Sequence, residues 1–179
     1  MNKYKNNFAY IDGNNLYQGV KNSGWKMDFR RFKRWLYDKY GVSRAYYFIG
    51  LIPKETSLYA SLQKAGFALI FKEVIYCRDG KPKGNCDADL VLQSAIDYFE
   101  KNCERQVLVA SDGDYACLAK FLKDNKALET ILSPNPKDKC SILLKRVNAP
   151  IVHLDDVKSK ICLNEKAPGK DGTLQGSFS

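Results

Sequence analysis

Four aspartates are the side chains of this sequence best suited to chemistry. Asp12 lies in Tyr-Ile-Asp-Gly-Asn-Asn-Leu, and Asp112 and Asp114 lie in Val-Ala-Ser-Asp-Gly-Asp-Tyr. Each phrase follows an apolar run that is typical of a buried β-strand and precedes a segment with helical character. Because the carboxyl ends of parallel strands line one crevice of an open α/β sheet, the two phrases are expected to meet there. Asp87 starts another helical pattern and can point to the same edge.

Gathered carboxylates repel one another unless a cation lies between them. A shell of carboxylate oxygens is what Mg²⁺ or Mn²⁺ prefers. The 29 Lys and Arg against 20 Asp and Glu give a net charge of +9, which favours partners that carry phosphates. Each aspartate also has a structural interpretation, since Asp12 and Asp112 precede glycines as in turns and Asp87 and Asp114 could cap helices. Their joint placement favours a metal site.

A basic segment ahead of Asp87 could guide a phosphate backbone towards such a site. Gly84 would allow close approach of the backbone, while the alternative is a solvated hairpin or loop. The cations of this segment are Lys72, Arg78, Lys81 and Lys83.

A second basic group follows Asp28, on the polar side of an expected helix. Its simplest interpretation is an exposed helix face. The group consists of Arg30, Arg31, Lys33 and Arg34.

Zinc and histidine chemistry are excluded by the cysteines and by His153, the single histidine. The six cysteines include no Cys-x-x-Cys pair, which zinc ligation requires. Cys103, Cys117 and Cys162 lie in helix-like segments and are expected to be small buried residues in a reducing compartment.

Strand-like runs alternate with helical periodicity, which is typical of a parallel sheet flanked by helices. The fold class predicted is α/β, a three-layer α/β/α sandwich with a mainly parallel central sheet. The expected strands are 8–12, 44–50, 67–74, 106–110, 128–133 and 150–154.

Helices are predicted between these strands. One is capped by Asp28 and stopped by Gly41. The most regular pattern starts at Asp87, and its apolar residues at helical spacing predict one buried face. That face comprises Ala88, Val91, Leu92, Ala95, Ile96 and Phe99, and the other expected helices are 54–65, 114–124, 139–147 and 155–163.

One domain, residues 1–163, accounts for these patterns, and the Gly-, Ser- and Lys-rich tail 164–179 is expected to be disordered. No run reaches the roughly 18 apolar residues of a membrane span, so no membrane contact is expected. The first residues lack a signal-peptide core, and a cytoplasmic location is expected.

Three motifs resemble those of NYN domains, the PIN-like ribonuclease domains of the LabA and DUF88 type. They are Tyr-Ile-Asp-Gly-Asn-Asn-Leu-Tyr at 10–17, Lys-Gly-Asn-Cys-Asp-Ala-Asp-Leu-Val-Leu at 83–92 and Ser-Asp-Gly-Asp-Tyr at 111–115. The resemblance covers roughly residues 6–163, in the order and approximate spacing of the family. It implies a PIN-like, Rossmann-like sandwich and metal-dependent cleavage of RNA.

The resemblance also implies a set of site residues. Asp12, Asp87, Asp112 and Asp114 would form the catalytic, metal-holding site. Asn14, Asn15 and Ser111 would support it. The sequence departs from the family where Ala110-Ser111 replaces Ser-Gly and where Asp89 replaces Glu.

The expected reaction is hydrolysis of a phosphodiester in single-stranded RNA by in-line attack of water activated by one or two Mg²⁺ or Mn²⁺ ions. Asp12, Asp87 and Asp112 would hold the metal, and Asp114 would complete the outer shell. Lys81 and Lys83, with Lys72 and Arg78 nearby, would bind the flanking backbone. Tyr17 or Tyr115 could stack a base.

Two other functions stay open on the sequence alone. A non-catalytic RNA-binding or regulatory module would bind RNA without metal. A phosphatase or other phosphotransfer enzyme would also use aspartate loops after strands, but no accompanying Thr and Lys motifs are found. A homodimer is a further open expectation.

Overall fold

A six-stranded, all-parallel sheet forms the centre of the molecule in the computed structural model, which describes residues 5–76, 82–83 and 85–163. The strand order is β3-β2-β1-β6-β7-β8, and the predicted α/β class is confirmed. The strands are β1 (Asn7–Asp12), β2 (Val42–Gly50), β3 (Ala68–Lys72), β6 (Gln106–Val109), β7 (Leu128–Ser133) and β8 (Ile151–His153).

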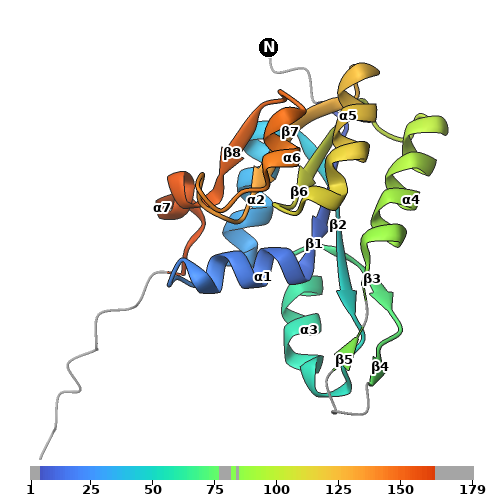
Figure 1. Ribbon diagram of the computed structural model, residues 1–179. Coiled ribbons are helices and arrows are strands. Elements are labelled where there is room, and N and C mark those ends of the chain that lie inside the picture. The colour runs from blue at the N-terminus through green and yellow to red at the C-terminus, as the bar shows by residue number, and fades with distance from the viewer. Residues whose placement is uncertain (1–4, 77–81, 84, 164–179) are drawn as a thin grey trace, which may run out of the picture.

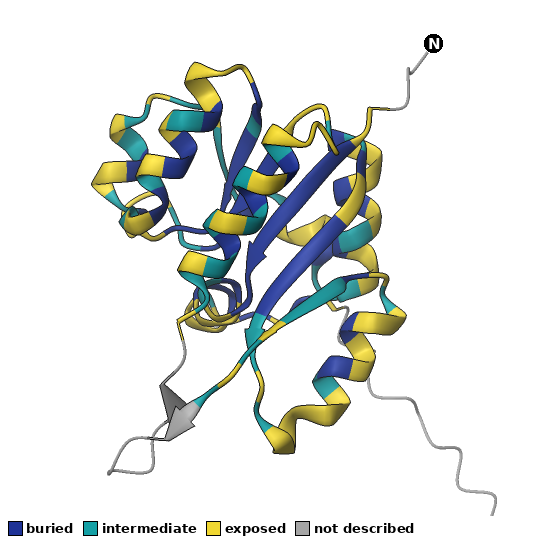
Figure 2. Cartoon of the chain, turned by 90° about the vertical axis from the view of Figure 1, so that its right-hand side faces the viewer, coloured by how far each residue is buried: buried dark blue, intermediate teal, exposed yellow. Residues whose placement is uncertain are grey.

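Helices cover both faces of the sheet (Figure 1). Apolar residues alternate along β1, so that Ala9 and Ile11 join one core and Phe8 and Tyr10 join the other. Figure 2 shows the central strands buried beneath these layers. The first core holds α1 (Gly13–Asn22), α2 (Phe29–Tyr40), α3 (Thr56–Lys64) and α7 (Lys158–Ile161), and the second holds α4 (Asp87–Phe99), α5 (Ala116–Asp124) and α6 (Ile142–Arg146).

Local signals set the helix ends. The Asp28 side chain accepts hydrogen bonds from the backbone amides of Arg30 and Arg31, both at 3.0 Å, and so caps α2 as predicted. Gly41 ends α2 at φ +65°, a conformation that suits glycine. Short 3₁₀ turns replace the first residues of three predicted helices. These turns are η1 (Pro53–Glu55), η2 (Gly113–Tyr115) and η3 (Leu154–Val157).

Helix α4 has its predicted start but not its predicted orientation. Leu92 and Phe99, expected inside, are 61% and 71% exposed, whereas Ser94 and Asp97 are buried. The inward polar groups are satisfied, since Ser94 Oγ donates to the Gln106 side chain and Asp97 accepts from the Tyr10 hydroxyl at 2.7 Å. The helix is therefore apolar on its outer side as well, and the prediction of its buried face was wrong.

The chain order places a switch point between β1 and β6. From β1 the chain continues outward through β2 and β3, then returns to β6 on the other side of β1 and continues to β7 and β8. Connections on the two sides of such a point diverge, which opens a crevice at the carboxyl ends of the two strands. The loops after Asp12 and Val109 lie at that crevice.

Several sequence expectations need correction or lie outside the described residues. Strands β4 (Ile75–Tyr76) and β5 (Pro82–Lys83) form a short antiparallel hairpin ahead of α4, which matches the alternative of a hairpin. Cys103 lies in a loop rather than a helix. The tail 164–179 is outside the described residues, and the single domain at 1–163 stays a prediction. Within the described part of the chain, no helix is long and apolar enough to cross a membrane.

Candidate functional site

Asp12 lies where β1 ends and α1 begins, and its side chain is only 7% exposed. Its Oδ1 accepts a hydrogen bond from the Asn15 amide at 2.9 Å, so it caps α1. The next residue must be small, because a Cβ at Gly13 would lie 2.7 Å from the Phe48 carbonyl oxygen. Burial raises the pKa of Asp12 above its usual 3.8, and Asp87 raises it further, while hydrogen bonds from Asn15 and Tyr115 oppose this shift.

Tyr115 joins Asp12 to Asp87. Its hydroxyl lies 2.9 Å from Asp12 Oδ2 and 2.5 Å from Asp87 Oδ1, and its side chain is fully buried. A phenol has one proton to donate, so two carboxylates share a single donor. Burial and the two carboxylates raise the pKa of Tyr115, which keeps the hydroxyl protonated. The two carboxylates therefore lie close together, joined through one shared hydroxyl.

Asp87 stands in the first turn of α4, where the helix dipole favours a carboxylate. Cys86 rather than Asp87 occupies the N-cap position, so the capping interpretation of Asp87 was wrong. Asn85 fixes the side chain instead, donating to Asp87 Oδ2 at 2.8 Å and accepting from the Asp87 amide at 2.9 Å. Nothing in the sequence patterns singled out Asn85 as a contact of Asp87.

Asn15 ties the loop after β1 to the loop after β6. Its Oδ1 accepts from the Ser111 amide at 2.9 Å and from the Ser111 hydroxyl at 2.7 Å. The structure therefore brings these two expected supporting residues together, although the chain separates them widely. Asn14 is exposed beside them.

Asp112 and Asp114 lie on the exposed rim of the site, whereas Asp12 is buried and Asp87 is half-buried. Asp112 Oδ1 accepts from the Asp114 amide at 3.2 Å and caps η2. The structural interpretation had given the cap to Asp114 instead, and that interpretation was wrong. Asp114 lies inside that 3₁₀ turn. Among the described residues, no three Asp, Glu, His or Cys side chains gather closely enough to hold a metal ion together.

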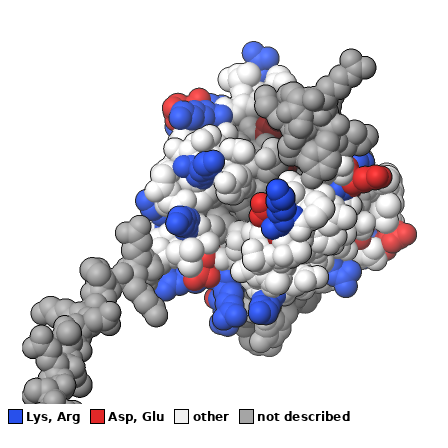
Figure 3. Space-filling view, turned by 90° about the horizontal axis from the view of Figure 1, so that it is seen from below, with Lys and Arg blue, Asp and Glu red and all other residues white. Residues whose placement is uncertain are grey.

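The expected RNA-binding cations fall into three cases. Lys72 pairs with Asp89 at 2.8 Å, and this contact raises the pKa of Lys72. Arg78 and Lys81 lie outside the described residues, and only the backbone of Lys83 is described. Figure 3 looks onto the carboxyl ends of the strands, where acidic side chains lie between Lys and Arg side chains.

The protonation of Cys86 and the exposure of two tyrosines bear on the chemistry of the site. Burial, and the charges of Asp12, Asp89 and Asp87 after it, raise the pKa of Cys86 to about 11, so its thiol stays protonated at neutral pH. Tyr17 is 56% exposed and carries the Lys21 ammonium over its ring, 5.4 Å from the centroid, whereas full burial excludes stacking on a base for Tyr115. The stacking role expected for Tyr115 was wrong, because only the fold shows which atoms its hydroxyl reaches.

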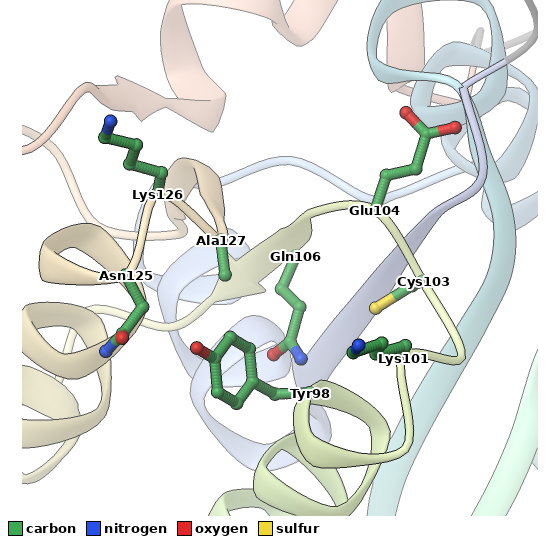
Figure 4. A pocket seen from close by; sticks show the side chains of 8 residues that line it. All are labelled: Tyr98, Lys101, Cys103, Glu104, Gln106, Asn125, Lys126 and Ala127. Atoms are coloured by element: carbon green, nitrogen blue, oxygen red, sulfur yellow. The ribbon is translucent and has the colours of Figure 1, made fainter.

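A pocket of about 170 Å³ lies at the opposite, amino-terminal end of the strands (Figure 4). Tyr98 and Gln106 point into it, and Lys101 and Asn125 stand at its sides. It holds none of the four candidate aspartates, so it is separate from the carboxylate site.

A family model described as the NYN domain matches residues 9–151. The chain belongs to the NYN domain family. NYN domains are part of the PIN-like nuclease superfamily, so the resemblance stated from the three motifs is confirmed at this level. No curated protein matches the sequence significantly. The crystal structure of a protein of unknown function from Vibrio parahaemolyticus is similar to this NYN protein, with a TM-score of 0.69 and 22% identity over 91% of this chain and 99% of that one. At this level of identity, the similarity shows a shared fold and nothing about activity.

The Asp12–Asp87 pair suits a hard divalent ion. Asp12 Oδ2 and both carboxylate oxygens of Asp87 each accept one of the hydrogen bonds described above, from Tyr115 or Asn85. Each of these oxygens has a second lone-pair position. Mg²⁺ is commonly held by one or two carboxylates and several waters. The donor set of Asp12 and Asp87 therefore fits such an ion, with the rim acids nearer to solvent.

Proposed function

We propose that this NYN domain is a metal-dependent ribonuclease of the LabA-like type that hydrolyses phosphodiester bonds of single-stranded RNA at the Asp12–Asp87 pair. The observation that carries the proposal is the sharing of one buried phenol proton by two carboxylates at the switch point of the sheet. Two close carboxylates repel each other unless a cation lies between them, so this pair favours a cation. The family membership supports phosphodiester chemistry in this domain.

Each residue of the site has a distinct part in this proposal. Asp12 and Asp87 would hold Mg²⁺ or Mn²⁺, which when bound lowers the pKa of a water and neutralises charge on a phosphate. Tyr115 keeps the two carboxylates at a fixed separation, and Asn85 fixes the rotamer of Asp87. Asn15 and Ser111 hold the two loops in register.

The rim acids Asp112 and Asp114 would act from the solvent side. Both are exposed, and their backbone positions are fixed by the η2 turn. We propose that they bind water or an outer ion rather than the ion held by Asp12 and Asp87. Substituting Asp112 should therefore reduce cleavage less than substituting Asp12.

A second function has one observation in its favour. The four aspartates do not gather into a group of three or more within the described residues, which suits a non-catalytic RNA-binding or regulatory NYN module. Such a module would bind RNA in EDTA as well as in Mn²⁺.

The two functions separate in one assay. A labelled single-stranded RNA is incubated with the protein in Mn²⁺, in Mg²⁺ and in EDTA, beside Asp112→Asn and Asp87→Asn. The ribonuclease predicts products that require metal, decrease with Asp112→Asn and disappear with Asp87→Asn. Intact RNA together with a clear binding shift would instead support the regulatory module.

We also propose a homodimer, supported by the outer side of α4. Leu92, Ile96 and Phe99 are 61%, 37% and 71% exposed and lie at helical spacing on one stripe. A helix that is apolar on both sides is usually covered on both. Sedimentation of the wild type and of Leu92→Lys over a range of concentrations tests this, and a wild type that stays monomeric throughout would contradict it.

A further inference from the structure

A basic groove lies between α2 and α7, outside the carboxylate site. Its volume is about 470 Å³. The two helices are held together by the Asp28 amide, which donates to the Ile161 carbonyl at 2.9 Å, and by a backbone bridge between Met27 and Cys162. The groove is lined by Arg30, Arg31, Arg34, Trp35, Asp38 and Lys160.

The groove has the charge of a polyanion site. Four of its six lining side chains are cations, all of them exposed, and one is a carboxylate. Arg30 and Arg34 are one helical turn apart, so their guanidinium groups follow one side of α2. Asp38 pairs with Arg34 at 2.7 Å and so orients that guanidinium along the groove. Guanidinium groups bind phosphates with two parallel hydrogen bonds.

The form of the groove disfavours a membrane surface. Trp35 is its large apolar side chain and is only 7% exposed. Helices that lie on a bilayer present protruding apolar side chains beside their cations. Here the indole is recessed as a floor between charged side chains, which suits a chain that lies in the groove.

The groove begins at the same end of the sheet as the carboxylates. The Phe29 ring, next to Arg30, packs on the Tyr47 ring with centroids 6.2 Å apart. Tyr47 in turn packs against Gly13, which follows Asp12. These two contacts place the start of α2 beside the loop that follows Asp12, and an RNA strand bound at Asp12 would reach Arg30 by extending over the start of α2.

We propose that this α2–α7 groove binds the phosphate backbone of single-stranded RNA beyond the cleavage site. The inference rests on the proposed ribonuclease function and assigns its substrate a second contact surface. Cations that neutralise phosphates release counterions, so their contribution to affinity falls as salt rises. A long RNA uses the groove and the carboxylate site together, whereas a very short one reaches only one of them.

The test compares two double variants that each remove two exposed cations. Arg30→Gln/Arg34→Gln changes the groove. Lys120→Gln/Lys126→Gln changes one cation in α5 and one in the turn after it. Lys120 pairs with Asp124 in the same i,i+4 arrangement as Arg34 with Asp38. RNA binding is measured by fluorescence anisotropy in EDTA at several salt concentrations. Two lost phosphate contacts should lower the salt slope by about 1.4 and the affinity about 20-fold near 0.1 M salt.

Cleavage in Mn²⁺ then separates this inference from the proposed function. Groove substitution should raise KM for a long RNA, leave kcat unchanged and have little effect on a very short RNA. If RNA affinity depends on salt equally in the two double variants while the wild type still cleaves RNA, the groove proposal is overturned. The proposed ribonuclease function is not affected by that result. Binding that persists without any cleavage would refute the ribonuclease but not the groove. Loss of binding to anionic vesicles, with RNA binding unchanged, would overturn the groove's assignment to RNA.

Discussion

Tyr115→Phe removes one oxygen atom from the site and tests whether the shared proton matters. In the metal-free protein, the two carboxylates lose their common donor, while the ring and its packing remain. A hydrogen bond to a charged group contributes about 1.5–3 kcal/mol to stability. Because the phenol has one proton, Tyr115→Phe removes one such hydrogen bond. We therefore expect the free energy of unfolding to fall by about 2 kcal/mol. For a chain of this length, that lowers Tm by about 4–8 °C.

The measurement is urea unfolding of wild type and Tyr115→Phe, in EDTA and then in excess Mn²⁺. A bound cation neutralises the two carboxylates in place of the phenol hydrogen bond. The difference in free energy of unfolding between wild type and Tyr115→Phe should therefore shrink in Mn²⁺. Tyr10→Phe is the matched control, because Tyr10 is also buried and donates to Asp97 at 2.7 Å, far from the site. The loss of unfolding free energy caused by Tyr10→Phe should be the same in EDTA and in Mn²⁺. Equal stability of Tyr115→Phe and wild type in EDTA would refute the reasoning.

The remaining predictions concern single side chains. Asp12→Asn should stabilise the metal-free protein increasingly as pH rises, because a raised pKa in the folded state makes the ionised carboxylate unfavourable. The gain should vanish below the usual aspartate pKa of 3.8, and unfolding at several pH values in EDTA checks this. Tyr40→Phe should be neutral or stabilising by up to about 1–3 kcal/mol in urea unfolding, since its buried hydroxyl lacks a partner among the described residues. Leu90→Ala should cost about 2–5 kcal/mol and Leu92→Ala much less; equal losses in thermal unfolding would contradict the orientation of α4.

The sequence predicted the layers of the fold because its signals are local. Strand-like runs, the Asp28 cap and the Gly41 stop each act within a few residues, and the structure reproduces them. The face of α4 was mispredicted because periodicity identifies an apolar stripe without saying which side meets the sheet. Ser94 and Asp97 turn inward since Gln106 and Tyr10, distant in the chain, satisfy them.

The candidate site shows the same division. The sequence predicted that Asp12, Asn15 and Ser111 share one site, because their loops follow adjacent strands, but not that Asp12 caps α1 or that Asn15 accepts from Ser111. The hydroxyl of Tyr115 between two acids depends on the meeting of β1, α4 and η2 in space. No spacing in the sequence encodes that meeting, and the exposure of Asp112 was hidden for the same reason.

The most direct test of the central claim is the single-turnover rate of RNA cleavage in Mn²⁺ for wild type, Asp12→Asn and Asp97→Asn. Asp12 and Asp97 are both buried carboxylates that accept from a tyrosine hydroxyl, but Asp97 faces the other end of the sheet. The account predicts that Asp12→Asn abolishes metal-dependent cleavage while RNA binding persists, and that a folded Asp97→Asn cleaves like wild type. Cleavage that survives Asp12→Asn, or falls equally in both variants, would contradict it.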